Sequence, residues 1–256
     1  MMISARTLRI DLSYKGTEFR GFAENPGVRT VGGELRQALE TVLGEEIELT
    51  VAGRTDAGVH ALGQVVSFHT TNESVDPDLL RDSLNGMCSS DLRVQAVTLA
   101  EADFNARFSA SKRTYHYNIL NSPTADPLHA DVEWHIGPPL DVDAMNDAAS
   151  RFIGEHDFTS FCRRPKDRLD EPLIRRVLTS EWIWIAEQRL RFVIEGNAFC
   201  HQMVRSLTGF CVAAGFGKRS ADEFEAVVRA KDRSAAPPIA PPHGLTLMQV
   251  SYQKSG

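Results

Sequence analysis

The sequence predicts an α+β fold with two ferredoxin-like halves, joined in a continuous, mainly antiparallel sheet with helices on one side. Apolar side chains alternate at every second position in the predicted strands and recur every three or four positions in the predicted helices. The order strand-helix-strand-strand-helix-strand occurs twice along the chain, which is the split β-α-β arrangement. We place the boundary after residue 104, with an N-terminal half of residues 1–104 and a C-terminal half of residues 105–256.

The N-terminal half opens with the strand "TLRIDLSY", in which every second residue is apolar. The segment "TVGGELRQALETVLG" is predicted to be an amphipathic helix, capped by Thr30 at its start and by Gly44 at its end. Pro77 opens a second helix, "PDLLRDSLNGM". Strands at 46–51, at 65–70 and in "LRVQAVTL" complete the first unit.

The C-terminal half repeats this order with the strand "RTYHYNIL" and a helix from Val142 to about Ile153. Only two residues separate the strands "RRVLTSEWIWIA" and "RLRFVIEG", which predicts a hairpin. A helix from near Phe199 towards Gly215, an inserted helix "SADEFEAVVRAK" and the closing strand "LTLMQVSY" follow. The charged "RRPKDRLDEP" is expected to be an exposed loop, and the proline-rich "AAPPIAPPHG" an extended connector.

The composition of the chain is that of a globular protein without a membrane span. With 256 residues, 42% of them hydrophobic and 24% charged, the chain has ordinary globular usage, which excludes a disordered tail. No apolar run approaches the ~20 residues of a membrane span, and no signal-peptide core is seen, so we expect a cytoplasmic protein. The four cysteines have no metal-type spacing and are expected to be buried free thiols. A net charge of -6 disfavours nucleic-acid binding over the whole surface but permits a local basic cleft.

The segment "AGRTDAGVHALGQVVSF" is the first candidate site. It follows one predicted strand and leads into another, and its glycines surround Asp56, Arg54 and His60. Glycines in such a loop permit positive φ angles and close approach of a ligand to the backbone. On spacing alone, a functional loop and a simple turn between strands are equally supported.

Basic residues gather in the C-terminal half. Arg107, Lys112 and Arg113 flank the strand that contains Tyr115, and more arginines and lysines lie between 163 and 176. Basic side chains interleaved with aromatic ones suit a nucleic acid whose bases are splayed out and stacked.

Arg205 lies beside an apolar stripe of its predicted helix, where an arginine usually has a carboxylate or phosphate partner. The dipeptide His156-Asp157 could belong to a metal-dependent hydrolase, but we expect it to turn a helix into a loop, since no matching partners are visible.

The motifs "YKGTEFRGF", "RTVGGEL", "GRTDAGVHALGQVVSF", "FNARFSASKRTYHY", "GEHDFTSF", "GNAFCHQMVRSLTG" and "PPHGLTLMQVSY" occur in order along essentially the whole chain. Through them the chain resembles the TruA-type tRNA pseudouridine synthases. The resemblance implies isomerisation of uridine to pseudouridine at positions 38, 39 and 40 of the tRNA anticodon stem-loop, without metal or organic cofactor. It also implies a homodimer and a central RNA-binding cleft.

Five residues match site positions of that family. Asp56 matches the catalytic aspartate, which could attack C1′, add to C6 or take the 2′ proton. Arg205 matches its ion-pair partner, and Tyr115 matches the tyrosine that stacks on the target base. Arg54 matches a residue that helps to extrude the nucleotide, and Leu245 an apolar residue packed near the uracil.

The chain departs from the family pattern at Lys15, Gly32 and Asn105, where many relatives have an acidic residue, glutamine and histidine, and none of these is an assigned catalytic position. One alternative is a non-catalytic RNA-binding module of two RRM-like halves, which share the same element order. Such a binder has little use for Asp56, and the sequence lacks the RRM aromatic signature.

Overall fold

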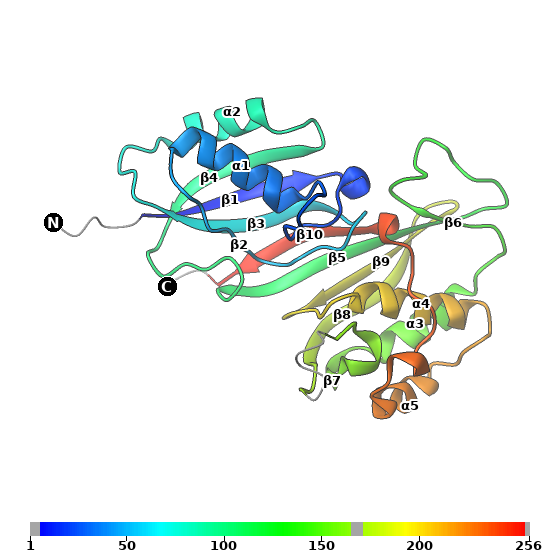
Figure 1. Cartoon of the computed structure of the whole chain (residues 1–256). Helices are drawn as coiled ribbons and strands as arrows, with labels where there is room; N and C mark the ends of the chain where they lie inside the picture. The colour runs from blue at the N-terminus through cyan, green and yellow to red at the C-terminus, as the bar shows by residue number, and fades with distance from the viewer. Residues whose placement is uncertain (1–5, 165–170, 254–256) are drawn as a thin grey trace. The chain divides into compact units, whose positions relative to one another are not determined.

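The computed structural model describes residues 6–164 and 171–253 of the chain. These residues form a mixed α+β fold with five α-helices and ten strands, which confirms the predicted class (Figure 1). They group into two compact units, one of residues 6–111 and 247–253 and the other of residues 112–246, less the six undescribed positions.

The sheet of the first unit has the ferredoxin-like order β4-β1-β3-β2. The central strand β1 (Arg6–Tyr14) pairs antiparallel with β3 (His60–Thr70) and with β4 (Leu92–Ala100). The short β2 (Thr50–Val51) pairs antiparallel with β3. The last strand, β10 (Leu245–Tyr252), also neighbours β3, and most of its residues group with this unit.

The two helices of the first unit, α1 (Val31–Leu43) and α2 (Pro77–Met87), cover one face of this sheet (Figure 1). Their ends confirm the sequence signals. The hydroxyl of Thr30 accepts a hydrogen bond from the N–H of Gly33, and Gly44 ends α1 in the left-handed region at φ +71°. Pro77 is the first residue of α2, after the capping carboxylate of Asp76.

The second unit has the strand order β5-β9-β8-β7. Its antiparallel strands are β5 (Ala110–Asn121), β9 (Arg189–Gly196), β8 (Ile174–Ala186) and β7 (Gly154–Asp157). The three-residue β6 (Trp134–Ile136) pairs parallel with β5. The helices are α3 (Val142–Ser150), α4 (Met203–Gly215) and α5 (Glu223–Ala230), and the first two pack together.

A cluster of aromatic side chains forms the core around α4 and α5. Phe210 of α4 and Phe224 of α5 contact Phe161 of the 3-10 helix η2 (Phe158–Phe161), with ring centroids 5.6 to 6.2 Å apart. All three rings are fully buried. This packing fixes the position of α4, the helix that carries Arg205.

Three features differ from the sequence expectation. Helix α4 begins at Met203 rather than near Phe199, because Gln202 adopts a left-handed φ of +67° that cannot continue a helix backwards. Strand β3 begins at His60, five residues earlier than predicted, and β2 covers only the end of the predicted strand. Strands β6 and β7 were not predicted, since three or four residues carry no readable alternation.

The expectation of four free thiols is wrong for two of them. Cys162 and Cys200 form a disulfide with their Cα atoms 5.8 Å apart, while Cys88 and Cys211 are buried and free. The paired cysteines are 38 residues apart in sequence, so no local spacing announces them, and only the packing of η2 beside the start of α4 brings them together. Among the described residues, no helix is long and apolar enough to cross a membrane.

Candidate functional site

The loop between β2 and β3 carries Asp56. Arg54 is exposed, Asp56 is half-buried, and the side chain of Thr55 between them is buried. Backbone hydrogen bonds hold the loop in place. The N–H of Phe22 donates to the carbonyl of Thr55 at 3.1 Å, and the N–H of Val59 donates to that of Asp56 at 3.2 Å. The carboxylate therefore stands on a fixed loop rather than on a free one.

The segment after β1 approaches this loop closely. A Cβ atom on Gly16 would lie 2.0 Å from the carbonyl oxygen of Val59, and one on Gly21 would lie 3.0 Å from that of Thr55. Gly21 also has a φ of +96°, which side-chain-bearing residues rarely adopt. The N–H of Gly16 donates to Nδ1 of His60, which is 5% exposed. His60 therefore links the start of β3 to the segment after β1.

A buried polar network supports the loop from below. The hydroxyls of Tyr14 and Thr55 lie 2.8 Å apart. The side-chain amide of Gln64, on β3, donates to the Tyr14 hydroxyl at 3.1 Å and to the carbonyl of Gly53 at 2.8 Å. Hydrogen bonds from this network therefore hold Thr55 and Gly53, which lie one and three positions before Asp56.

The second unit holds Tyr115, Arg205 and Leu245. Tyr115 lies on β5 opposite Ile194 of β9, is 8% exposed, and meets the ring of Phe199 edge-on at 5.3 Å. Leu245 is the first residue of β10 and is 6% exposed. Beside it, the backbone of Gly244 runs so close to Tyr117 that a Cβ would lie 2.6 Å from that ring.

Arg205 is held by the proline-rich connector. Its Nε donates to the carbonyl of Ala240 at 2.8 Å, and the N–H of Ala240 donates back to the carbonyl of Arg205 at 3.1 Å. The side chain is 8% exposed on the otherwise apolar helix α4. Burial lowers the pKa of the nearby His243, and the positive charge of Arg205 lowers it further. The connector thus orients the guanidinium of Arg205. The sequence did not predict this contact between the connector and the helix.

The five predicted site residues are therefore divided between the units: Arg54 and Asp56 in the first, Tyr115, Arg205 and Leu245 in the second. Each lies on a loop, strand or helix whose position is fixed within its own unit. The convergence of Asp56 with Arg205 and Tyr115 stays a prediction.

The basic residues near Tyr115 serve the fold as well. Lys112 forms an ion pair with Glu195 at 2.9 Å, and Arg113, 7% exposed, donates to the carbonyl of Asn197 at 2.7 Å. The expected basic loop includes Lys166 and Arg168, which lie outside the described residues.

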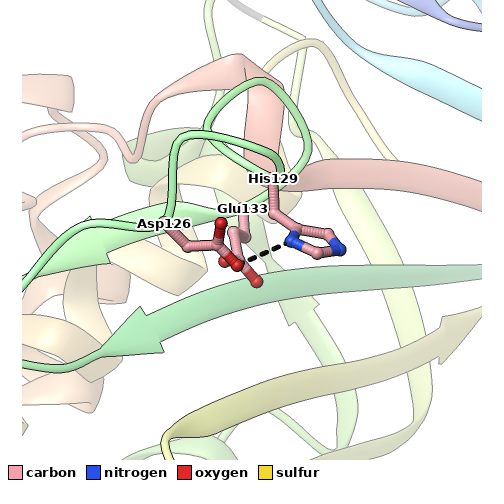
Figure 2. A group of neighbouring side chains, drawn as sticks. All are labelled: Asp126, His129 and Glu133. Atoms are coloured by element: carbon pink, nitrogen blue, oxygen red, sulfur yellow. Dashed lines mark hydrogen bonds and ion pairs between the residues drawn. The ribbon is translucent and has the colours of Figure 1, made fainter.

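One group with metal-ligand chemistry occurs among the described residues: Asp126, His129 and Glu133. Figure 2 shows the imidazole of His129 turned towards Asp126, with Nδ1 2.7 Å from the carboxylate. Arg189 contacts Asp126 and donates from Nε to Glu133 at 3.0 Å. One guanidinium thus binds both carboxylates, so we interpret the group as an ion-pair network of the fold.

His156 and Asp157 have structural roles. The ring of His156 packs edge-on against Phe158 and Phe224, with centroids 5.6 and 5.2 Å apart. Asp157 caps η2 by accepting from the N–H and the hydroxyl of Thr159. The expectation that this dipeptide turns a helix into a loop is wrong, because both residues lie in strand β7, paired with β8, and lead into η2. These packing and capping contacts give the hydrolase hypothesis no support.

Sequence reasoning missed Tyr14, Gln64 and Phe199. A signal exists for the first two: Tyr14 continues the inward alternation of β1, and Gln64 precedes a run of apolar residues in β3. A hydroxyl or amide at an inward position must find partners, so such residues mark buried networks. No local pattern identifies Phe199, whose contact with Tyr115 depends on the fold.

A family model described as tRNA pseudouridine synthase matches residues 12–109 and 148–253. A tRNA pseudouridine synthase A from Streptomyces avermitilis is 44% identical over 253 residues, covering 96% of this chain and 87% of the relative. The protein of the same name from Halalkalibacterium halodurans is 39% identical, covering 94% and 90%, and that from Thermosipho melanesiensis is 37% identical, covering 95% and 98%.

Proposed function

The chain belongs to the tRNA pseudouridine synthase family and is an isomerase, and from this premise we propose its reaction and its site. We propose that it converts uridine to pseudouridine at positions 38, 39 and 40 of the tRNA anticodon stem-loop. Asp56 is the essential carboxylate, and no cofactor takes part. The observation that carries the residue assignment is the Asp56 loop. It presents one half-buried carboxylate on a backbone fixed by hydrogen bonds on both sides.

The chemistry fits a single carboxylate. The N1–C1′ bond breaks, a C5–C1′ bond forms, and the proton lost from C5 is balanced by one gained at N1, so substrate and product have the same atoms. No oxidant, reductant or co-substrate is required. Asp56 can serve this reaction by attack on C1′, by addition to C6 or by removal of the 2′ proton, and each route requires the ionised form.

The other site residues support this role. We assign Arg205 as the cation that keeps Asp56 ionised, because its guanidinium is buried and oriented by Ala240. Tyr115, fixed edge-on against Phe199, is assigned to stack on the uracil, with Leu245 packing beside it. Arg54 is exposed on the same loop as Asp56 and is assigned to hold the place of the flipped nucleotide.

The experiment that tests the proposed position uses the purified chain and unmodified tRNA transcripts. Pseudouridine is located by carbodiimide-dependent stops in primer extension. We expect stops at positions 38 to 40 where these are uridine, and none in a transcript with cytidine at all three. Stops only elsewhere in the tRNA would overturn the assigned position, and binding of the transcript without any stop would favour the RNA-binding module.

We further propose that the protein acts as a cytoplasmic homodimer, with each tRNA contacting both copies. Support for the dimer comes from the part of β8 that follows residue 177. This part carries exposed apolar side chains, including Trp184 at 54% exposure. Strand β7 pairs only with residues 174–177 of β8, which leaves this part at the edge of the unit's sheet. Sedimentation equilibrium should give twice the mass of the chain, and Trp184→Glu should shift it towards the monomer. A monomeric wild type would overturn this.

A further inference from the structure

We propose that Tyr14 and Gln64 are positioning residues for the reaction, which hold Asp56 in its working geometry through a buried chain of hydrogen bonds to Thr55 and Gly53. This inference rests on the proposed role of Asp56. It concerns side chains that are hydrogen-bonded to Thr55 and Gly53 and would act on Asp56 through the backbone of the loop.

The donors and acceptors of the Gln64 side chain follow from the chemistry of its partners. The carbonyl of Gly53 can only accept, so the atom of Gln64 that faces it at 2.8 Å must be the amide nitrogen. The same nitrogen then donates its second hydrogen to the hydroxyl of Tyr14 at 3.1 Å. The Tyr14 hydroxyl also bonds the hydroxyl of Thr55 at 2.8 Å, and either oxygen can be the donor of that bond. The remaining amide oxygen of Gln64 accepts from the N–H of Val65 at 3.2 Å.

Burial makes this chain rigid. Gln64 is 0% exposed, Tyr14 4% and Thr55 8%, so water does not compete for these bonds. Burial also raises the pKa of Tyr14 to about 12, and its hydroxyl therefore keeps its proton at any working pH. Packing restrains the Tyr14 ring, which meets Phe19 and Phe22 with centroids 6.4 and 6.3 Å away.

The chain connects the loop to the sheet at two points. Gln64 lies in β3 and Tyr14 ends β1, and these strands pair with each other, so Gly53 and Thr55 are bonded to one rigid support. The carbonyl of Thr55 is separately bonded to Phe22. Loss of the Tyr14 hydroxyl would free the side chain of Thr55 and permit the adjacent Asp56 to move. A displacement of about 1 Å in a catalytic group reduces the rate by about a hundredfold.

The test compares Tyr14→Phe, Thr55→Val and their double variant with Tyr252→Phe. The control removes another tyrosine hydroxyl of the first unit, which donates to the carbonyl of Ala106 at 2.8 Å. The readouts are the single-turnover rate of pseudouridine formation at saturating enzyme, tRNA affinity by filter binding, and the folded fraction by circular dichroism. Rates are expressed per folded molecule, so a loss of stability alone does not lower them.

We expect Tyr14→Phe and Thr55→Val each to lower the rate by about tenfold to a hundredfold with tRNA affinity unchanged. The double variant should be no slower than the slower single variant, because both remove the same bond. Thr55→Ser, which keeps the oxygen, should restore the rate, and Tyr252→Phe should keep it. A wild-type rate in Tyr14→Phe, multiplicative losses in the double variant, or a slow Thr55→Ser would overturn the inference. A wild type that forms no pseudouridine would instead overturn the proposed function itself.

Discussion

At the scale of single residues, Gly16 shows how closely the site is packed. The ideal Cβ position on Gly16 falls 2.0 Å from a backbone oxygen of the Asp56 loop, and backbone cannot rotate away as a side chain can. Any larger residue must therefore displace either the loop or the end of β1. The glycine is required here by a close approach rather than by an unusual φ angle.

Substitution of Gly16 tests whether the space beside this glycine is closed to a larger side chain. We expect Gly16→Ala to lower the free energy of unfolding by about 1–3 kcal/mol, because the added carbon has no space. The matched control is Gly86→Ala in α2, where a Cβ meets nothing within 4 Å. That change should raise stability by about 0.5 kcal/mol, through the better helix propensity of alanine. Urea titrations measure both, and equal effects of the two substitutions would contradict the packing argument.

Asp157 is a second residue whose environment has a measurable consequence. Burial acts to raise the pKa of its carboxyl, but hydrogen bonds from Thr159 and Leu173 and the ammonium of Lys231 outweigh it, so the pKa lies below its ordinary value. A carboxyl with a lowered folded pKa stabilises the protein above the unfolded pKa of about 3.9, and this contribution is lost as the pH falls through the folded value.

We therefore expect Asp157→Ala to lower the free energy of unfolding by about 1–2 kcal/mol at pH 7, as for loss of a cap with its hydrogen bonds. The difference between wild type and variant should shrink as the pH is lowered from about 5 to 2, which denaturant titrations at each pH would measure. A difference that stays constant over this range would show that the charge of Asp157 has no part in stability.

At the scale of elements, the disulfide links η2 to the segment before α4. A crosslink between residues 38 apart is expected to contribute about 4 kcal/mol, mainly by restricting the unfolded chain. Reductant should therefore lower the melting temperature of the wild type, and the double variant Cys162→Ser/Cys200→Ser should melt at the reduced temperature with or without reductant. Identical melting of oxidised and reduced wild type would contradict a stabilising bond.

Elements with their own end signals could be predicted from the sequence. Thr30 and Gly44 bound α1 as expected, and Pro77 starts α2, because capping depends on residues within one turn of the helix end. The start of α4 could not be predicted, because the left-handed conformation of Gln202 has no glycine or asparagine to announce it. The strand β6 could not either, since its pairing with β5 depends on contacts distant in sequence.

At the scale of the whole molecule, the doubled element order predicted the α+β class, and the motif around Asp56 predicted the family. That β10 neighbours β3 could not be predicted from that order, because strand neighbours are set by tertiary pairing. The local sequence patterns predicted which loop, strand or helix carries each site residue. They did not reveal what holds these residues, such as the bond from Arg205 to Ala240 or the network beneath Thr55.

The central claim is that one carboxylate, Asp56, performs the isomerisation, and Asp56→Asn tests it most directly. The control is Asp78→Asn on α2, whose side chain is 82% exposed. Each protein is incubated in excess with a tRNA transcript, and pseudouridine at positions 38 to 40 is mapped after binding is verified. We predict that Asp56→Asn binds the transcript but forms no pseudouridine, while Asp78→Asn matches the wild type. Pseudouridine formed by Asp56→Asn at the wild-type rate would contradict the account.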